Sequence, residues 1–124
     1  MKKVLVCGGR DFKDLPLMEA ALNEFLKPGD ILMHGAAPGA DKLAAKLAGL
    51  TPDVEIWRFP AQWTLYGKSA GPLRNQEMLN ANPNIVIAMP GGKGTEDMVG
   101  RAERRNIRVV RAIRDEKGRI KFKG

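Results

Sequence analysis

The chain has 124 residues, with 21 Lys and Arg against 14 Asp and Glu, and therefore a formal net charge of +7. This length predicts one compact domain, and a composition of 44% hydrophobic and 28% charged residues excludes intrinsic disorder and a fibrous architecture. No apolar run approaches the roughly 20 residues that span a bilayer, so we expect no membrane partner and a cytoplasmic location.

The sequence alternates between β-rich apolar runs and segments with helical spacing of apolar residues. In chain order it predicts a strand at 3–7, a helix from Asp14 to about 26, a strand at 31–33, a helix around 43–48, a strand at 54–59, a long loop at 60–71, a helix at 72–80, a strand at 84–89, a helix ending near 105 and a strand at 107–113. This alternation predicts an α/β protein, a three-layer Rossmann-like fold with a mainly parallel five-stranded sheet. We expect a ligand-binding domain at 1–113 and a basic C-terminal tail or edge strand at 114–124.

The single cysteine and the single histidine narrow the classes of chemistry. Cys7 has no partner for an intramolecular disulfide, and it cannot build a cysteine-based zinc site. His34 is not accompanied by an evident Ser-His-Asp arrangement. We therefore expect no metal and no cofactor, and we expect Cys7 to be a core residue.

The positive charge is concentrated near the C-terminus. Residues 93–124 hold eleven Lys and Arg against five Asp and Glu, whereas residues 1–92 are nearly neutral. A basic surface of this kind fits a nucleic acid or another polyanion, and it equally fits a solvated face that keeps the protein soluble.

Four loops carry most of the informative residues, and each follows or precedes a predicted element at the same end of the sheet. Their sequences are Gly-Gly-Arg-Asp at 8–11, Gly-Ala-Ala-Pro-Gly-Ala-Asp at 35–41, the stretch at 63–75, and Pro-Gly-Gly-Lys-Gly-Thr at 90–95. Ligands of open parallel sheets bind beyond the carboxyl ends of the strands, where glycine allows the backbone to approach a phosphate. None of the four is a P-loop or a Gly-x-Gly-x-x-Gly motif.

The same four segments, in this order, resemble the YspA/YpsA-like branch of the SLOG superfamily, which joins the Smf/DprA DNA-processing proteins to the Lonely Guy phosphoribohydrolases. The resemblance covers about residues 3–113. It implies a Rossmann-like domain that binds a nucleotide or a nucleotide-derived ligand. Because Lonely Guy enzymes build shared sites in dimers, it also implies a homodimer.

Comparison with the Lonely Guy pattern yields candidates for chemistry. The loop at 90–95 resembles their phosphate loop, and Arg74 falls where their helix supplies a catalytic or substrate-binding arginine. Those enzymes place a glutamate where this chain has Met98, so cleavage of an N-glycosidic bond would need Glu96 or Asp97 instead. The candidate catalytic residues are therefore Arg74, Glu96 and Asp97.

The candidate ligand-binding residues come from all four loops. They are Gly8, Gly9, Arg10, Asp11, Gly35, Gly39, Asp41, Trp63, Tyr66, Arg74, Asn75, Gly91, Gly92, Gly94 and Thr95. Several have a structural alternative. Asp41 fits either a ribose hydroxyl or the positive end of its helix, and Asp11 fits either a ligand contact or a local cap. Trp63 and Tyr66 fit either base stacking or packing of the long loop, and Asn75 fits either a ligand contact or a helix cap.

Three functions follow, in decreasing order of support. The first is binding of a nucleotide or nucleotide-derived phosphorylated ligand, as a sensor or a processing protein. The second is phosphoribohydrolase-like cleavage of a nucleoside 5′-monophosphate. The third is nucleic-acid binding through the basic C-terminal third.

Overall fold

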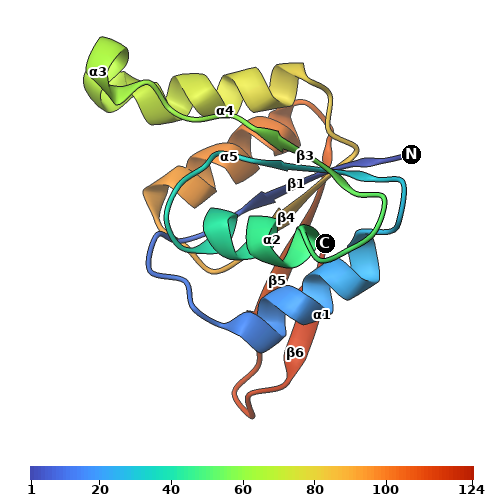
Figure 1. The fold of residues 1–124 in the computed structure, drawn as a ribbon. Helices are drawn as coiled ribbons and strands as arrows, with labels where there is room; N and C mark the ends of the chain where they lie inside the picture. Colours follow the sequence, from blue (N-terminus) through green and yellow to red (C-terminus); the bar gives the residue numbers. More distant parts are fainter.

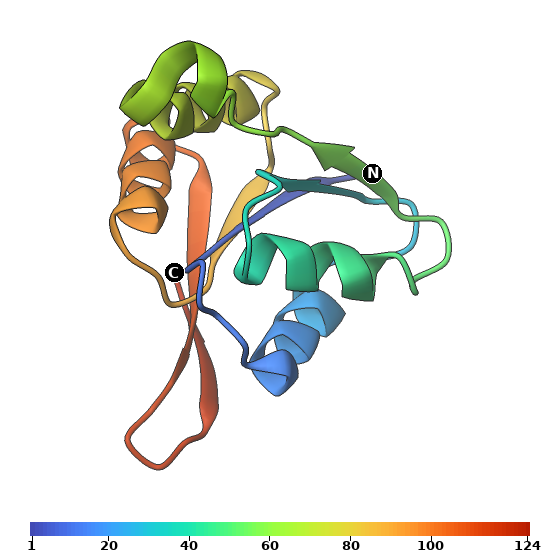
Figure 2. The same ribbon diagram turned by 60° about the vertical axis from the view of Figure 1, so that its left-hand side comes forward.

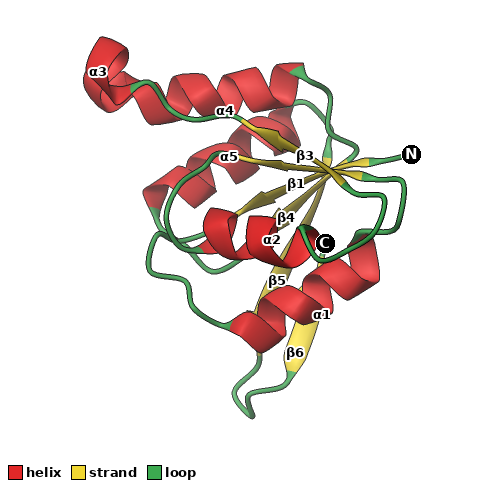
Figure 3. Cartoon of the chain, viewed as in Figure 1, coloured by secondary structure: helices red, strands yellow, loops and turns green.

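The computed structural model describes residues 1–124 and confirms the predicted α/β fold (Figures 1 and 3). Its elements are β1 (Lys3–Cys7), α1 (Leu15–Phe25), β2 (Ile31–His34), α2 (Ala40–Ala48), β3 (Glu55–Arg58), α3 (Trp63–Tyr66), the 3-10 helix η1 (Gly67–Ser69), α4 (Ala70–Asn80), β4 (Ile85–Ala88), α5 (Lys93–Arg104), β5 (Arg108–Arg114) and β6 (Ile120–Lys123). No helix is both long enough and apolar enough to cross a membrane.

The sheet has six strands in the order β3-β2-β1-β4-β5-β6. The first five are parallel, and β6 pairs antiparallel with β5. The chain thus builds the sheet outward from β1 in two directions, first through β2 and β3 and then through β4 and β5. The two directions of winding meet between β1 and β4, which makes this the topological switch point of the sheet.

Helices cover both faces of the sheet and give it three layers (Figure 2). The core under α1 and α2 takes Val4 and Val6 from β1, whereas the core under α4 and α5 takes Leu5 and Cys7 from the same strand. This division follows from the period of two along a strand, which sends neighbouring side chains to opposite faces. Cys7 lies in the core, as predicted, and burial raises the pKa of its thiol.

The C-terminal residues form an edge strand rather than a tail. Asp115 and Arg119 close the turn between β5 and β6, where the amide of Asp115 donates to the carbonyl of Arg119 over 2.9 Å. Phe122 of β6 then packs edge-on against Phe25 of α1, with ring centroids 5.3 Å apart. This aromatic contact joins the last strand to the core layer beneath α1.

The loop predicted at 60–71 is more ordered than its sequence indicated. It contains the single turn of α3, then η1, and α4 already begins at Ala70, before the expected start. Pro72 is tolerated there because it stands in the first turn of α4, where its missing amide hydrogen would have had no partner within the helix. α3 buries no residue and projects beyond the end of α4 (Figure 1).

Candidate functional site

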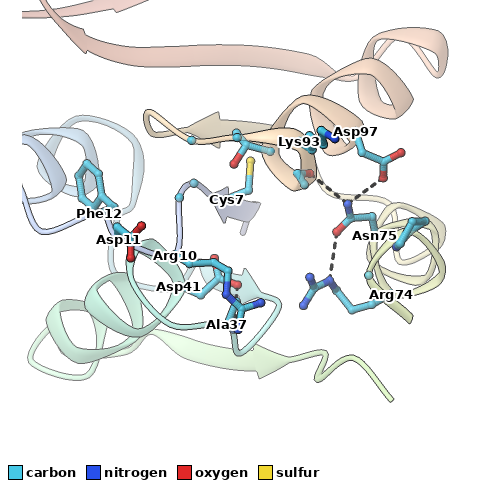
Figure 4. Close-up of a pocket in the computed structure, with 18 of the residues that line it drawn as sticks. Cys7, Arg10, Asp11, Phe12, Ala37, Asp41, Arg74, Asn75, Lys93 and Asp97 are labelled. Carbon is cyan, nitrogen blue, oxygen red and sulfur yellow. Dashed lines mark hydrogen bonds between the residues drawn. The ribbon is translucent and has the colours of Figure 1, made fainter. Parts of the chain in front are cut away.

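A cavity of about 990 Å³ lies at the carboxyl ends of the strands, around the switch point between β1 and β4 (Figure 4). All four sequence segments contribute to its wall. The lining residues are 7–12, Ala37, Asp41, Trp63, Gly71, Pro72, Arg74, Asn75, Met78, 90–95 and Asp97. The volume lies at the upper end of the range of roughly 300 to 1,000 Å³ for small-molecule sites.

Most of the predicted site residues meet in this cavity. Those in its wall are Gly8, Gly9, Arg10, Asp11, Asp41, Trp63, Arg74, Asn75, Gly91, Gly92, Gly94, Thr95 and Asp97. Gly35, Gly39, Tyr66 and Glu96 do not line it. The wall also contains residues that were not among the candidates, of which Phe12, Met78 and Lys93 are the largest. Met78 could have been found from its spacing, because it lies one helical turn after Arg74 and Asn75.

Glycine allows the loops after β1 and β4 to touch. The amide of Gly9 donates to the carbonyl of Pro90 over 2.9 Å. A Cβ atom at Gly8 would lie 2.7 Å from the Cβ atoms of Ala40 and Met89, so no larger residue fits there without a shift. Gly39 lies outside the cavity wall, and its glycine has a structural reason. Its φ is +79°, and it packs against the Gly9 carbonyl, where a side chain would not fit.

The start of α5 differs from these tight contacts because it is open. Gly92, the N-cap, supplies no side-chain hydrogen bond, and a Cβ atom at Gly92 or Gly94 would meet nothing within 4 Å. The amides of residues 93–95 donate no hydrogen bond within the protein. Thr95 is only 5% exposed, yet its hydroxyl also lacks a partner within the protein. These donors, together with the positive end of the helix dipole, favour an anion.

Arg74 reaches across from α4 to the loop after β2. Its Nε donates to Asn75 Oδ1 over 3.1 Å, and its Nη1 donates to the carbonyl of Gly35. Gly35 therefore positions Arg74 through its carbonyl, although it lies outside the cavity wall. Glycine is required at this position because a Cβ atom would collide with the guanidinium. Burial lowers the pKa of Arg74, and the charge of Arg10 adds to this effect, while Asp41 opposes it. No carboxylate forms an ion pair with Arg74.

Asn75 ties α4 to α5 and caps neither helix. Its buried Nδ2 donates to Asp97 Oδ2 over 2.9 Å and to the carbonyl of Gly94 over 3.3 Å, as Figure 4 shows. Arg101 pairs with the same Asp97 carboxylate over 2.9 Å. The chain of contacts from Arg74 through Asn75 to Asp97 fixes the wall of the cavity between the two helices.

The two carboxylates predicted to replace the missing glutamate face different directions. Asp97 lines the cavity, whereas exposed Glu96 forms a bidentate pair with Arg111 of β5, with both distances 2.9 Å. Consecutive residues of a helix differ by about 100° in direction, so the two side chains cannot share one face. Glu96 therefore stands outside the site. Met98 is fully buried in the core beneath α5.

Asp41 supports the loop that surrounds it. Its buried Oδ2 accepts from the amides of Gly35 over 2.9 Å and of Ala37 over 3.2 Å. Burial raises the pKa of this carboxyl, although the two hydrogen bonds and Arg74 act in the opposite direction. Its Oδ1 accepts no hydrogen bond within the protein, so one oxygen is left for a ligand.

The aromatic residues of α3 lie at the margin of the site. Trp63 is half exposed and contributes to the cavity wall, whereas Tyr66, 52% exposed, does not. Neither ring is buried in the core, although Trp63 lies beside Gly71 at the start of α4. Asp11 also lines the cavity and forms no side-chain hydrogen bond or ion pair within the protein.

His34 is buried behind the site with one nitrogen unsatisfied. Its Nδ1 accepts from the amide of Ala36 over 3.0 Å, while its Nε2 has no partner. Burial lowers the pKa of the imidazole, and the charges of Arg58 and Arg74 lower it further. The hydrogen bond at Nδ1 places the proton of the neutral ring on Nε2.

We expect the His34 imidazole to titrate below its ordinary pKa of about 6.5. The unfolded chain then binds more protons than the folded one, so the free energy of unfolding falls as pH drops from about 6.5 through the folded pKa. Because the sequence has one histidine, proton NMR on a protein without a histidine tag reads this pKa directly. A value at or above 6.5 would contradict the burial of this ring.

His34→Asn serves as the control for the stability measurement, because its carboxamide oxygen can accept from Ala36 without titrating. It should flatten the dependence of stability on pH just below pH 6.5. The raised pKa of Asp41 changes the free energy of unfolding in the opposite direction, because the folded chain binds the proton of this carboxyl more tightly than the unfolded chain does. The free energy of unfolding therefore falls as pH rises through the pKa of Asp41.

Comparisons with known proteins support the resemblance to the SLOG superfamily, and the family match includes the first two of the four segments in full. The sequence profile of one family, described as the YspA, cpYpsA-related SLOG family, matches residues 2–66. The Gene 61 protein of Mycobacterium phage D29 is 35% identical in an alignment 121 positions long, and the alignment covers 89% of this chain and 95% of the phage protein.

Proposed function

Because this chain belongs to the YspA, cpYpsA-related SLOG family, we propose that its cavity binds a nucleotide or nucleotide-derived ligand by a phosphate group at the start of α5. The observation that carries the proposal is the open first turn of this helix. Three unpaired amides and the unpaired Thr95 hydroxyl face one cavity there, with Gly92 and Gly94 leaving the approach free. Such donors bind phosphate oxygens without a dedicated cation.

The rest of the cavity fits the remainder of a nucleotide. Phe12, Trp63 and Met78 supply apolar and aromatic surface for a base, and the free Oδ1 of Asp41 can accept from a ribose hydroxyl. Small-molecule sites commonly combine such apolar walls with a few fixed polar groups. We therefore assign phosphate recognition to α5 and base recognition to these three side chains.

A hydrolytic reaction is the second candidate, and the position of Asp97 favours it. Asp97 is the carboxylate of the predicted pair that lines the cavity, and Asn75 and Arg101 hold it in place. It could stabilise the positive charge that develops as an N-glycosidic bond breaks. Chromatographic detection of free base, formed by the wild type and not by Asp97→Asn, would establish this chemistry.

The basic C-terminal third gives weaker support to nucleic-acid binding. Arg101, Arg111, Arg114 and Arg119 each form an ion pair with a carboxylate at 2.7 to 2.9 Å. These pairs reduce the charge that the surface offers to a polyanion. The expected homodimer likewise stays a prediction, and Leu65 of α3 and Leu73 of α4 are exposed apolar side chains on which such an interface could form.

Two glycines of the same helix provide a matched test of the phosphate site. Gly94→Ala adds a methyl group within the open first turn, whereas Gly100→Ala adds one a few residues along α5, beside the flexible end of Arg104. Both changes replace glycine by alanine in a helix, so each should leave the free energy of unfolding unchanged or raise it by up to about 1 kcal/mol. Only Gly94→Ala should weaken binding, by about tenfold or more.

Calorimetry with the four common nucleoside 5′-monophosphates measures this difference. We expect at least one of them to bind the wild type and Gly100→Ala alike, and to bind Gly94→Ala less tightly. Absence of binding to the wild type, or equal affinity in both variants, would contradict the proposal.

A further inference from the structure

The cavity carries a second anion-binding group besides the start of α5. We propose that the ligand of this cavity has two phosphates separated by a sugar, as in a nucleoside 3′,5′-bisphosphate. This inference rests on the proposed function, because it assigns the first phosphate to the start of α5. It goes further in assigning the second phosphate to Arg10 and Arg74.

Arg10 and Arg74 approach the cavity from different elements. Arg10 belongs to the loop after β1, and Arg74 belongs to α4. They are close enough for the charge of Arg10 to disfavour the charged form of Arg74. Neither guanidinium forms an ion pair with a carboxylate of the protein. Arg74 is half-buried and Arg10 is exposed, and the nearby charge of Asp41 offsets part of their repulsion. A bound anion would be attracted by both guanidinium groups and would relieve the repulsion that remains.

The hydrogen bonds of Arg74 leave it ready for such an anion. Nε is engaged by Asn75 and Nη1 by the carbonyl of Gly35, so the plane of the guanidinium is fixed. Nη2 forms no hydrogen bond within the protein. An arginine held in this way can present its remaining donors to a phosphate with little loss of side-chain entropy.

The two anion-binding groups are anchored on different strands of the sheet. Arg74 is anchored on Gly35, directly after β2, whereas the open amides follow β4. β1 lies between these two strands, so the anchors are two strand spacings, or about 10 Å, apart at the sheet. Figure 4 shows Arg10 and Arg74 across the cavity from Lys93. Adjacent phosphates, as in a diphosphate, would span this separation less well than phosphates on both sides of a sugar.

Three carboxylates also line the cavity and must be compatible with two phosphates. Asp97 is paired with Arg101, and Asp41 directs one oxygen to two amides of its own loop. Asp11 is exposed at the rim, on the same loop as Arg10. Lys93 adds a further cation beside the open amides. None of these three carboxylates forms an ion pair with Arg10, Arg74 or Lys93, so these cations remain available to phosphate.

Calorimetry with matched nucleotides tests the inference. The probes are the 5′-monophosphates, 5′-diphosphates and 3′,5′-bisphosphates of adenosine, guanosine, cytidine and uridine, at one salt concentration. For the base that binds best, we expect the bisphosphate to bind at least tenfold more tightly than both the monophosphate and the diphosphate. Equal affinity for monophosphate and bisphosphate, or preference for the diphosphate, would overturn the inference while leaving the proposed function intact. Failure of all twelve probes to bind would overturn both.

Two cations of the loop after β1 provide the matched variants. Arg10 lines the cavity, whereas exposed Lys13 does not. Arg10→Gln should reduce the bisphosphate-to-monophosphate affinity ratio to near one, and Lys13→Gln should retain it. Equal ratios in the two variants would show that the preference reflects overall charge and would contradict the assigned role of Arg10.

Discussion

Replacing Arg74 by glutamine is expected to weaken ligand binding more than any other single change in the site. The variant loses a charge-assisted contact to phosphate, which corresponds to about 2 to 3 kcal/mol, or roughly 30- to 150-fold in affinity. The loss should be large because Asn75 and Gly35 hold the wild-type guanidinium in place before the ligand arrives. Calorimetric titration with the best-binding nucleotide measures it.

The stability of the same variant separates binding from folding. Glutamine loses hydrogen bonds of Arg74, but it also removes a desolvated charge that forms no direct ion pair in the protein. These contributions oppose one another, so the free energy of unfolding should change by no more than about 1 kcal/mol. Arg74→Lys should bind with intermediate affinity, because it keeps the charge and loses the planar fork. Wild-type affinity in Arg74→Gln would remove this residue from the site.

The largest loss of stability is expected from Gly91→Ala. A Cβ atom at this position would collide with the Thr95 hydroxyl and would lie 2.7 Å from the Gly9 amide nitrogen. The loops after β1 and β4 would have to separate, which would strain the hydrogen bond from Gly9 to the Pro90 carbonyl. Overpacking of this kind costs about 1 to 3 kcal/mol, and we expect the upper part of that range because backbone atoms are involved.

Gly92→Ala is the control for this measurement. Its added methyl group meets nothing within 4 Å, and its backbone φ of −107° suits any residue. Chemical denaturation should therefore show a change within about 0.5 kcal/mol for Gly92→Ala, as is usual for substitutions without new contacts. Equal destabilisation of the two variants would contradict the close approach of the two loops.

Local sequence patterns were sufficient to predict the fold. Apolar runs and glycine-rich turns identify β1, β2 and β4 because these strands are buried on both faces and carry almost no polar residue. α3 was missed because a single turn with no buried residue leaves no periodic pattern. The start of α4 was placed too late because Pro72 was expected at the first position of its helix.

The site was predictable in its location and less so in its contacts. Strand ends and glycines indicate which loops meet, but they do not show which way a helical side chain points. Glu96 and Asp97 are neighbours in the sequence, and only the packing of α5 directs Asp97 toward the cavity and Glu96 toward Arg111. Pairs such as Arg114 with Asp14 are separated by 100 residues, so net charge overstated the basic surface.

Chemical-shift mapping of the backbone amides tests the central claim most directly. Nitrogen-15-labelled protein would be titrated with the nucleotide that binds best in calorimetry, and the amide shifts would be assigned by residue. We predict that the largest shifts occur at residues 92–95, where the unpaired amides receive the phosphate, with further shifts at Gly9 and Arg10. Largest shifts within residues 104–124, with residues 92–95 unaffected, would contradict a phosphate site at the start of α5.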